Sequence, residues 1–115
     1  MITFLVRCRL RDDDAKHVEA EGIIADVVAL TERDEPDAVS YNFYRSANVS
    51  RELILVESYI SNEAFLKHNT SPHMVGFRER FADLFDAATN RVEMLEQMAG
   101  FSRSSLMEEP VGSCG

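Results

Sequence analysis

Two neighbouring apolar segments in the middle of the chain, residues 39–47 and 52–60, constrain the fold most. Segment 52–60 alternates, but both of its faces are largely apolar: Leu53, Leu55 and Tyr59 point one way, and Ile54 and Val56 point the other. Segment 39–47 is rich in Tyr and Phe, which favour strands. The three residues 48–50 between them fit a short turn, so the pair is predicted to form a β-hairpin. A strand that is apolar on both faces must be covered on both faces.

The other segments complete a single pattern. Residues 2–10 alternate as a strand, and residues 15–32 carry an apolar stripe at helical spacing, with Gly22 suggesting a close approach to the sheet. Ser61 is expected to cap a short helix over 62–68, and Ser71 with Pro72 to begin a helix that runs to about residue 89. A last strand is expected over 91–98. This order predicts an α+β, ferredoxin-like split βαβ domain with a four-stranded antiparallel sheet and both helices on one face. The uncovered apolar face predicts a homodimer that stacks two sheets.

Composition excludes several classes of function. The 115 residues fit one domain, expected over 1–99, followed by a disordered tail over 100–115. The net charge of −8 argues against nucleic acids and anionic membranes, and no apolar run is long enough to span a bilayer. The two cysteines, Cys8 and Cys114, lie at opposite ends of the chain, which favours a reducing cytoplasm over a disulfide framework.

The histidines are the candidate chemical groups. His68 and His73 lie five residues apart, at the end of the short helix and the start of the next. As a metal site the pair is incomplete, because no third His or Cys falls nearby. The acidic run at residues 12–14 is better explained as a helix-capping cluster than as a metal site. The sequence therefore predicts no metal.

The segments around these histidines resemble the antibiotic biosynthesis monooxygenase (ABM) family of dimeric α+β barrels. The resemblance covers about residues 1–99 and rests on four short motifs: Tyr41 to Arg45, Leu55-Val56-Glu57-Ser58-Tyr59, Ala64-Phe65-Leu66-Lys67-His68, and Ser71-Pro72-His73-Met74 with Phe77. The family includes cofactor-free oxygenases of quinols and anthrones, haem-degrading enzymes, and an isomerase that acts on phosphorylated autoinducer-2. The absence of Trp and the presence of Arg78 near the position of the haem-ligating histidine disfavour haem degradation. Pro36-Asp37 replaces the usual Pro-Gly before the second strand.

The resemblance implies a cofactor-independent monooxygenase that acts with O2 on a small aromatic quinol or phenol. In such an enzyme a base makes the phenolate, and histidine is the natural base near neutral pH. His68 and His73 are the catalytic candidates, and the expected substrate-binding residues are Tyr41, Tyr59, Phe77, Arg78 and Phe81. Two alternatives remain open: an isomerase of a small phosphorylated dicarbonyl, with Arg78 on the phosphate, and a non-catalytic small-molecule-binding barrel. In the non-catalytic case each histidine would bond neighbouring groups, and Glu57 is expected to pair with a backbone N–H or an Arg.

Overall fold

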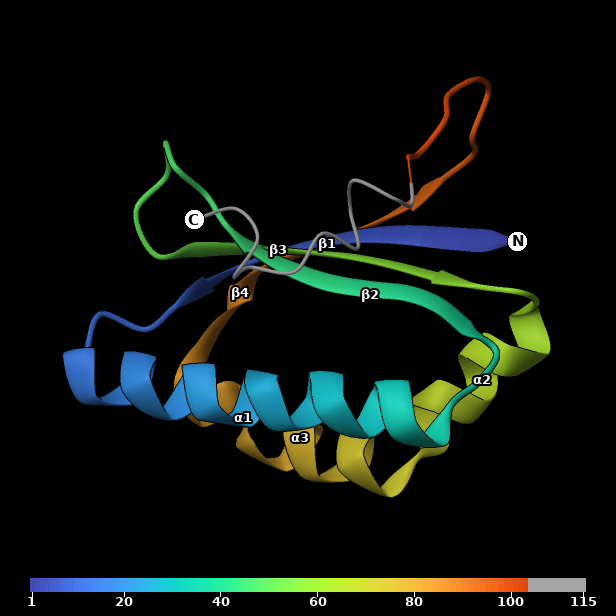
Figure 1. Cartoon of the computed structure of the whole chain (residues 1–115). Coiled ribbons are helices and arrows are strands. Elements are labelled where there is room, and N and C mark those ends of the chain that lie inside the picture. Colours follow the sequence, from blue (N-terminus) through green and yellow to red (C-terminus); the bar gives the residue numbers. More distant parts are fainter. Residues whose placement is uncertain (104–115) are drawn as a thin grey trace, which may run out of the picture.

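A computed structural model of the protein describes residues 1–103, so most of the tail expected over 100–115, including Cys114, lies outside the described residues. The described chain forms one sheet and three helices (Figure 1). In chain order the elements are β1 (Ile2–Leu10), α1 (Asp14–Asp34), β2 (Ala38–Arg45), β3 (Glu52–Tyr59), α2 (Asn62–Thr70), α3 (Pro72–Leu84) and β4 (Phe85–Leu95).

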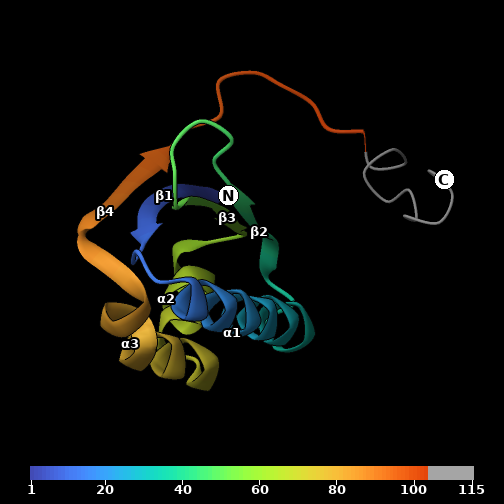
Figure 2. The same ribbon diagram turned by 90° about the vertical axis from the view of Figure 1, so that its left-hand side faces the viewer.

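The four strands form one antiparallel sheet in the order β2-β3-β1-β4. The register of the central pair places Phe4 opposite Glu57 and Cys8 opposite Leu53. All three helices lie on the same side of the sheet, which Figure 2 shows end-on. This is the ferredoxin-like α+β fold that the sequence predicts.

The helix ends follow the capping residues expected from the sequence. Ser61 accepts a hydrogen bond from the backbone N–H of Ala64 at 3.2 Å and begins α2. Ser71 caps α3 through the N–H of Met74, and Pro72 occupies the first helical turn. These polar caps satisfy backbone N–H groups that have no partner within the helix. They also fix the short α2–α3 junction, so that His68 and His73 lie on either side of one tight turn.

The last helix and the last strand differ from the prediction. The helix ends at Leu84 rather than near residue 89, and β4 covers Phe85–Leu95 rather than 91–98. The apolar stripe at helical spacing continues through Phe85, but Phe85 pairs with Leu10 of β1 and is only 3% exposed. Its ring stacks on Phe81 with centroids 4.8 Å apart. Strand pairing and core packing therefore override the local helical pattern here.

The core lies between the helices and the helix-facing side of the sheet. Buried residues of β1, β3 and β4 pack there against Ala20 of α1 and Leu84 of α3. The expected close approach at Gly22 is wrong, because a Cβ atom added there would meet nothing within 4 Å. On the other side of the sheet, Leu5, Ile54 and Val56 stay partly exposed, since α1, α2 and α3 all cover the opposite face. Within residues 1–103, no helix has the length and apolar character needed to cross a membrane.

Candidate active site

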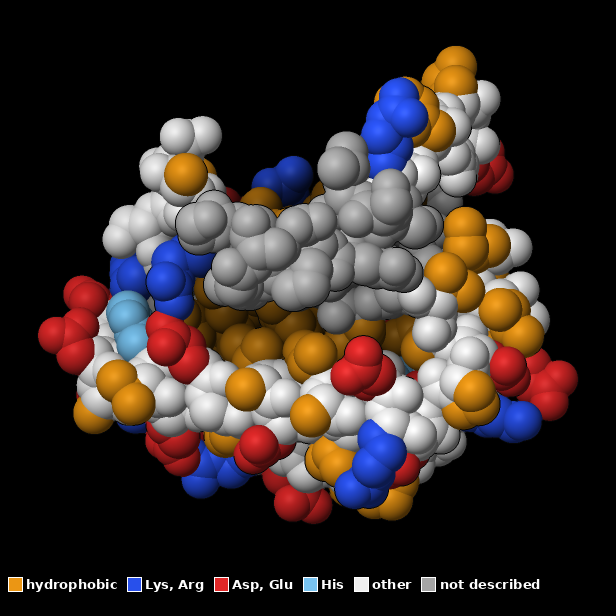
Figure 3. Space-filling model, viewed as in Figure 1, with side chains coloured by type: hydrophobic (Ala, Val, Ile, Leu, Met, Phe, Trp, Pro, Cys, Tyr) orange, Lys and Arg blue, Asp and Glu red, His pale blue; other side chains and the backbone are white. Residues whose placement is uncertain are grey.

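A cavity of about 490 Å³ lies between the sheet and the helices. Figure 3 shows hydrophobic side chains along the bottom of this hollow. The strands contribute Phe4, Val6, Cys8, Tyr41, Phe43, Leu53, Leu55, Glu57, Phe85, Asn90 and Val92, and the helices contribute Phe65, His68, Asn69, Met74, Phe77, Arg78 and Phe81. An apolar pocket with a few polar groups is the usual form of a small-molecule site.

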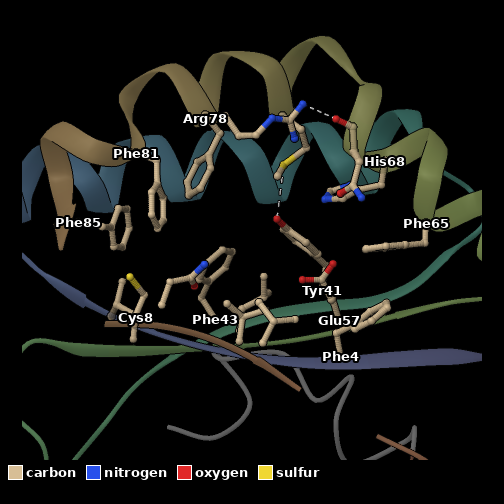
Figure 4. Close-up of a pocket in the computed structure, with 18 residues that line it drawn as sticks. Phe4, Cys8, Tyr41, Phe43, Glu57, Phe65, His68, Arg78, Phe81 and Phe85 are labelled. Atoms are coloured by element: carbon tan, nitrogen blue, oxygen red, sulfur yellow. Dashed lines mark hydrogen bonds between the residues drawn. The ribbon is translucent and has the colours of Figure 1, made fainter. Parts of the chain in front are cut away.

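His68 is a buried titratable group in the wall of this cavity. It belongs to the last turn of α2, is 1% exposed, and projects from the helices toward the strands (Figure 4). Its Nδ1 lies 2.9 Å from both carboxylate oxygens of Glu35, whereas its Nε2 is buried without any hydrogen-bond partner among the described residues. Burial lowers the pKa of His68, and the carboxylate of Glu35 only partly offsets that effect. The imidazole is therefore neutral near pH 7, with one nitrogen uncommitted.

His73 does not line the main cavity. It lies beside His68, with ring centroids 6.0 Å apart, but lines a second, more polar hollow of about 350 Å³. Its Nε2 is 2.6 Å from Oε2 of Glu35 and 3.3 Å from Oγ1 of Thr31. Of the two predicted catalytic histidines, one lines the apolar cavity and the other lies behind it.

Glu35 joins the two histidines and is the residue that the sequence reasoning missed. It is the C-cap of α1, and its side chain is 14% exposed. Glu35, His68 and His73 offer ligand atoms within 4.8 Å of one another, so a carboxylate completes the set that had no third His or Cys. The signal in the sequence was the acidic loop before Pro36. Nothing there distinguishes Glu35 from Asp34 or Asp37 until the helix end is placed.

The two tyrosines occupy different positions. Tyr41 lines the cavity, its ring centroid is 5.0 Å from that of His68, and its hydroxyl donates to the sulfur of Met74 at 3.8 Å. Tyr59 is fully buried outside the cavity lining and donates a 2.7 Å hydrogen bond to Glu57. Burial raises the pKa of both phenols, so both stay protonated at neutral pH. The expected partner of Glu57 was a backbone N–H or an Arg, and that expectation is wrong: the partner is a tyrosine.

The remaining predicted residues are all on α3 and all line the cavity. Phe77 and Phe81 form an aromatic wall, with ring centroids 6.1 Å apart, that continues to Phe85. Arg78 is exposed, and its guanidinium donates to the carbonyl of Asn69 (Figure 4). It is the one Lys or Arg side chain in the cavity lining of the described residues. The middle and the C-terminal half of α3 thus offer a cation next to aromatic surface.

The fold and the pocket together define a ferredoxin-like α+β domain with an apolar chamber under its sheet and a buried histidine in the chamber wall. The model of the family described as "Antibiotic biosynthesis monooxygenase" matches residues 1–80. The chain therefore belongs to the ABM family.

Solved structures agree with this assignment. Rv0793 from Mycobacterium tuberculosis is similar, at 26% identity and a TM-score of 0.74, over 88% of this chain and 98% of that one. A Caulobacter crescentus CB15 protein assigned to the antibiotic biosynthesis monooxygenases has 20% identity and a TM-score of 0.76, over 85% and 90% of the two chains. A Nitrosomonas europaea protein assigned to the same group has 18% identity and a TM-score of 0.73, over 86% of this chain and 100% of that one. A comparison with curated proteins found no match.

Proposed function

We propose that the protein is a cofactor-independent monooxygenase that oxidises a small phenolic or quinol-type aromatic substrate with O2, and that His68 is its general base. The observation that carries the proposal is the buried Nε2 of His68, which has no partner among the described residues and belongs to a residue of the cavity wall. A buried polar atom without a partner costs about 1–3 kcal/mol. A substrate hydroxyl bound there would remove that cost.

The base has the properties that the chemistry needs. Because burial lowers the pKa of His68, the imidazole is ready to accept a proton at neutral pH. The proton of the substrate hydroxyl moves to Nε2, and the phenolate that forms is electron-rich enough to reduce O2. In the overall balance, one oxygen atom of O2 replaces the hydrogen of one ring carbon and becomes a carbonyl, and the hydroxyl of the substrate becomes the second carbonyl of a quinone. The other oxygen atom leaves as water with the ring hydrogen and the hydroxyl hydrogen.

The walls suit a flat aromatic ring. Phe77, Phe81 and Phe85 supply ring faces, and Tyr41, whose ring lies beside that of His68, supplies a protonated hydroxyl. The Tyr41 hydroxyl has a sulfur atom as its partner, which is a weak acceptor. The Tyr41 hydroxyl can therefore turn to a substrate oxygen at low cost. The apolar walls also keep water from the reduced oxygen species.

Arg78 supports a second candidate function. A guanidinium beside an otherwise apolar cavity is suited to a phosphate or carboxylate group. With an anionic dicarbonyl substrate, His68 would instead move a proton next to a carbonyl, as in the isomerase alternative. This reaction consumes no oxygen.

One screen separates the candidates. Purified protein is given dihydroxynaphthalenes in an oxygen electrode, and a phosphorylated linear dione in a separate assay of substrate loss. Oxygen uptake that depends on the naphthalenediol supports the monooxygenase, and loss of the dione without oxygen uptake supports the isomerase. If neither compound reacts, the remaining function is a non-catalytic binding barrel, and the assignment of His68 as a base is wrong.

A further inference from the structure

The Glu35 side chain lies between two imidazole rings and contacts both. Its Oε1 and Oε2 are each 2.9 Å from Nδ1 of His68, and Oε2 is 2.6 Å from Nε2 of His73. The exposed fractions of the three side chains are 14%, 1% and 5%. The cluster is thus a short, largely buried bridge from the apolar cavity, which His68 lines, to the polar hollow, which Glu35 and His73 line.

The chemistry of the carboxylate fixes the tautomers of the rings. An ionised carboxylate only accepts hydrogen bonds. Each histidine nitrogen that faces it at these distances must therefore carry the proton: Nδ1 on His68 and Nε2 on His73. A neutral His68 with its proton on Nδ1 has a lone pair on Nε2, which is the nitrogen without a partner.

A metal ion explains the cluster less well than protons do. Two imidazoles and a carboxylate are a common ligand set for divalent ions, but tetrahedral zinc with bonds of about 2.0–2.1 Å needs ligand atoms about 3.3 Å apart. The contacts of 2.6 and 2.9 Å are hydrogen-bond lengths. A metal-binding histidine also normally donates its other N–H to a partner, and Nε2 of His68 has none.

We propose that Glu35 is the positioning residue of the base: it holds His68 in the tautomer whose Nε2 lone pair can receive the substrate proton, while His73 donates to the same carboxylate and fixes its orientation. The inference rests on the proposed function of His68 as a base. It changes the role of His73 from catalytic to positioning. It also explains why a largely buried acid lies at the end of α1, where a helix C-terminus disfavours negative charge.

A Glu35→Gln variant tests whether Glu35 acts through its charge and its control of the His68 tautomer, or only by filling space. The amide has nearly the same shape, but one of its two ends donates. An amide NH2 that faces His68 requires a lone pair on Nδ1, which moves the ring proton to Nε2 and removes the base. Glu35→Asp keeps an acceptor-only group. Glu32→Gln, on an exposed position of the same helix, is the matched control.

The test is ¹⁵N NMR of the histidine rings at pH 7, in the wild type and in the three variants. We expect His68 of the wild type, of Glu32→Gln and of Glu35→Asp to carry its proton on Nδ1, and His68 of Glu35→Gln to carry it wholly or partly on Nε2. If Glu35→Gln does not fold, the spectra of the wild type and of Glu35→Asp test the proposal by themselves. A wild-type His68 with its proton on Nε2 would overturn the proposal. So would stoichiometric Zn²⁺ binding that shifts the nitrogens of both rings.

Kinetics adds a second readout. With a substrate found in the oxygen-uptake screen, Glu35→Gln should lower kcat by about 10²–10⁴-fold with little change in KM, because binding surfaces stay intact while the base is lost. Glu35→Asp should recover most of that loss, and an unchanged kcat in Glu35→Gln would contradict the proposal. If the spectra are as expected but no substrate is oxidised, the tautomer assignment stands and the oxygenase assignment is refuted. Failure of the positioning proposal can therefore be distinguished from failure of the proposed function.

Discussion

Tyr59 donates its hydroxyl proton to the carboxylate of Glu57 at 2.7 Å, from two residues further along the same face of β3. Glu57 is 6% exposed and lines the cavity, yet no Lys or Arg of the described residues pairs with its charge. Burial accordingly raises the pKa of Glu57, and the tyrosine only partly offsets this. The carboxylate is a buried charge that costs stability.

The destabilising effect of the buried Glu57 carboxylate should appear as a pH-dependent difference in the free energy of unfolding between the wild type and Glu57→Gln. A carboxyl whose pKa is raised by folding binds more protons in the folded state, so stability is lost as pH rises from the unfolded value of about 4.5 through the folded pKa. Glu57→Gln carries no charge. The free energy of unfolding of Glu57→Gln, relative to the wild type, should therefore improve between pH 4.5 and pH 7.

Urea unfolding at both pH values measures this difference. Glu63→Gln is the control, since that side chain is 80% exposed and should show no such trend. The lowered pKa of His68 acts in the opposite direction, but it is present in both proteins and cancels in the comparison. A Glu57→Gln difference that is flat with pH would mean that folding does not raise the pKa of Glu57.

The sequence indicated the fold well because the determining signals are local and repeated. Alternation in residues 2–10, the two apolar strands of the hairpin, and the Ser61 and Ser71 caps each follow from short-range chemistry. The start of β4 was missed because Phe85 fits a helical stripe equally well. Only its pairing with Leu10, far away in the sequence, decides the conformation.

The site was less predictable than the fold for a similar reason. His68 and His73 are close in sequence, so their proximity could be inferred, but their division between two hollows depends on Glu35, more than 30 residues away. Period-two alternation groups Tyr59 with Leu53 and Leu55 on one face of its strand, but it does not say which face meets the helices. It cannot tell that Tyr41 reaches the cavity while Tyr59 is sealed beneath the α2 residue Phe65, with ring centroids 5.4 Å apart.

Gly22 should be replaceable with a gain in stability. It lies inside α1, and an added Cβ meets nothing within 4 Å. Gly22→Ala should therefore raise the free energy of unfolding by about 0.5–1 kcal/mol, because alanine loses less backbone freedom on folding. Thermal unfolding measures it, and Gly76→Ala in α3, which is equally open, should behave alike. A loss of stability in Gly22→Ala would contradict this prediction.

The face of the sheet opposite the helices should pair with a second copy. Leu5, Ile54 and Val56 lie on this face, partly exposed. Sedimentation at micromolar concentration should give about twice the chain mass of 13.0 kDa. Val56→Glu should shift the protein toward the monomer, whereas Val18→Glu, at a position of α1 that is 72% exposed, should leave the dimer intact. A wild-type monomer at these concentrations would contradict the stacked-sheet dimer.

The central claim is that His68 is the base of the apolar chamber, and the most direct test is kcat/KM of His68→Ala with a substrate that the wild type oxidises. Removing a positioned base should lower kcat/KM by about 10²–10⁴-fold while the fold, followed by circular dichroism, is retained. His17→Ala controls for loss of an imidazole, because His17 bonds the carbonyl of Arg11 and lies outside the cavity lining. A full wild-type rate in a folded His68→Ala protein would contradict the account.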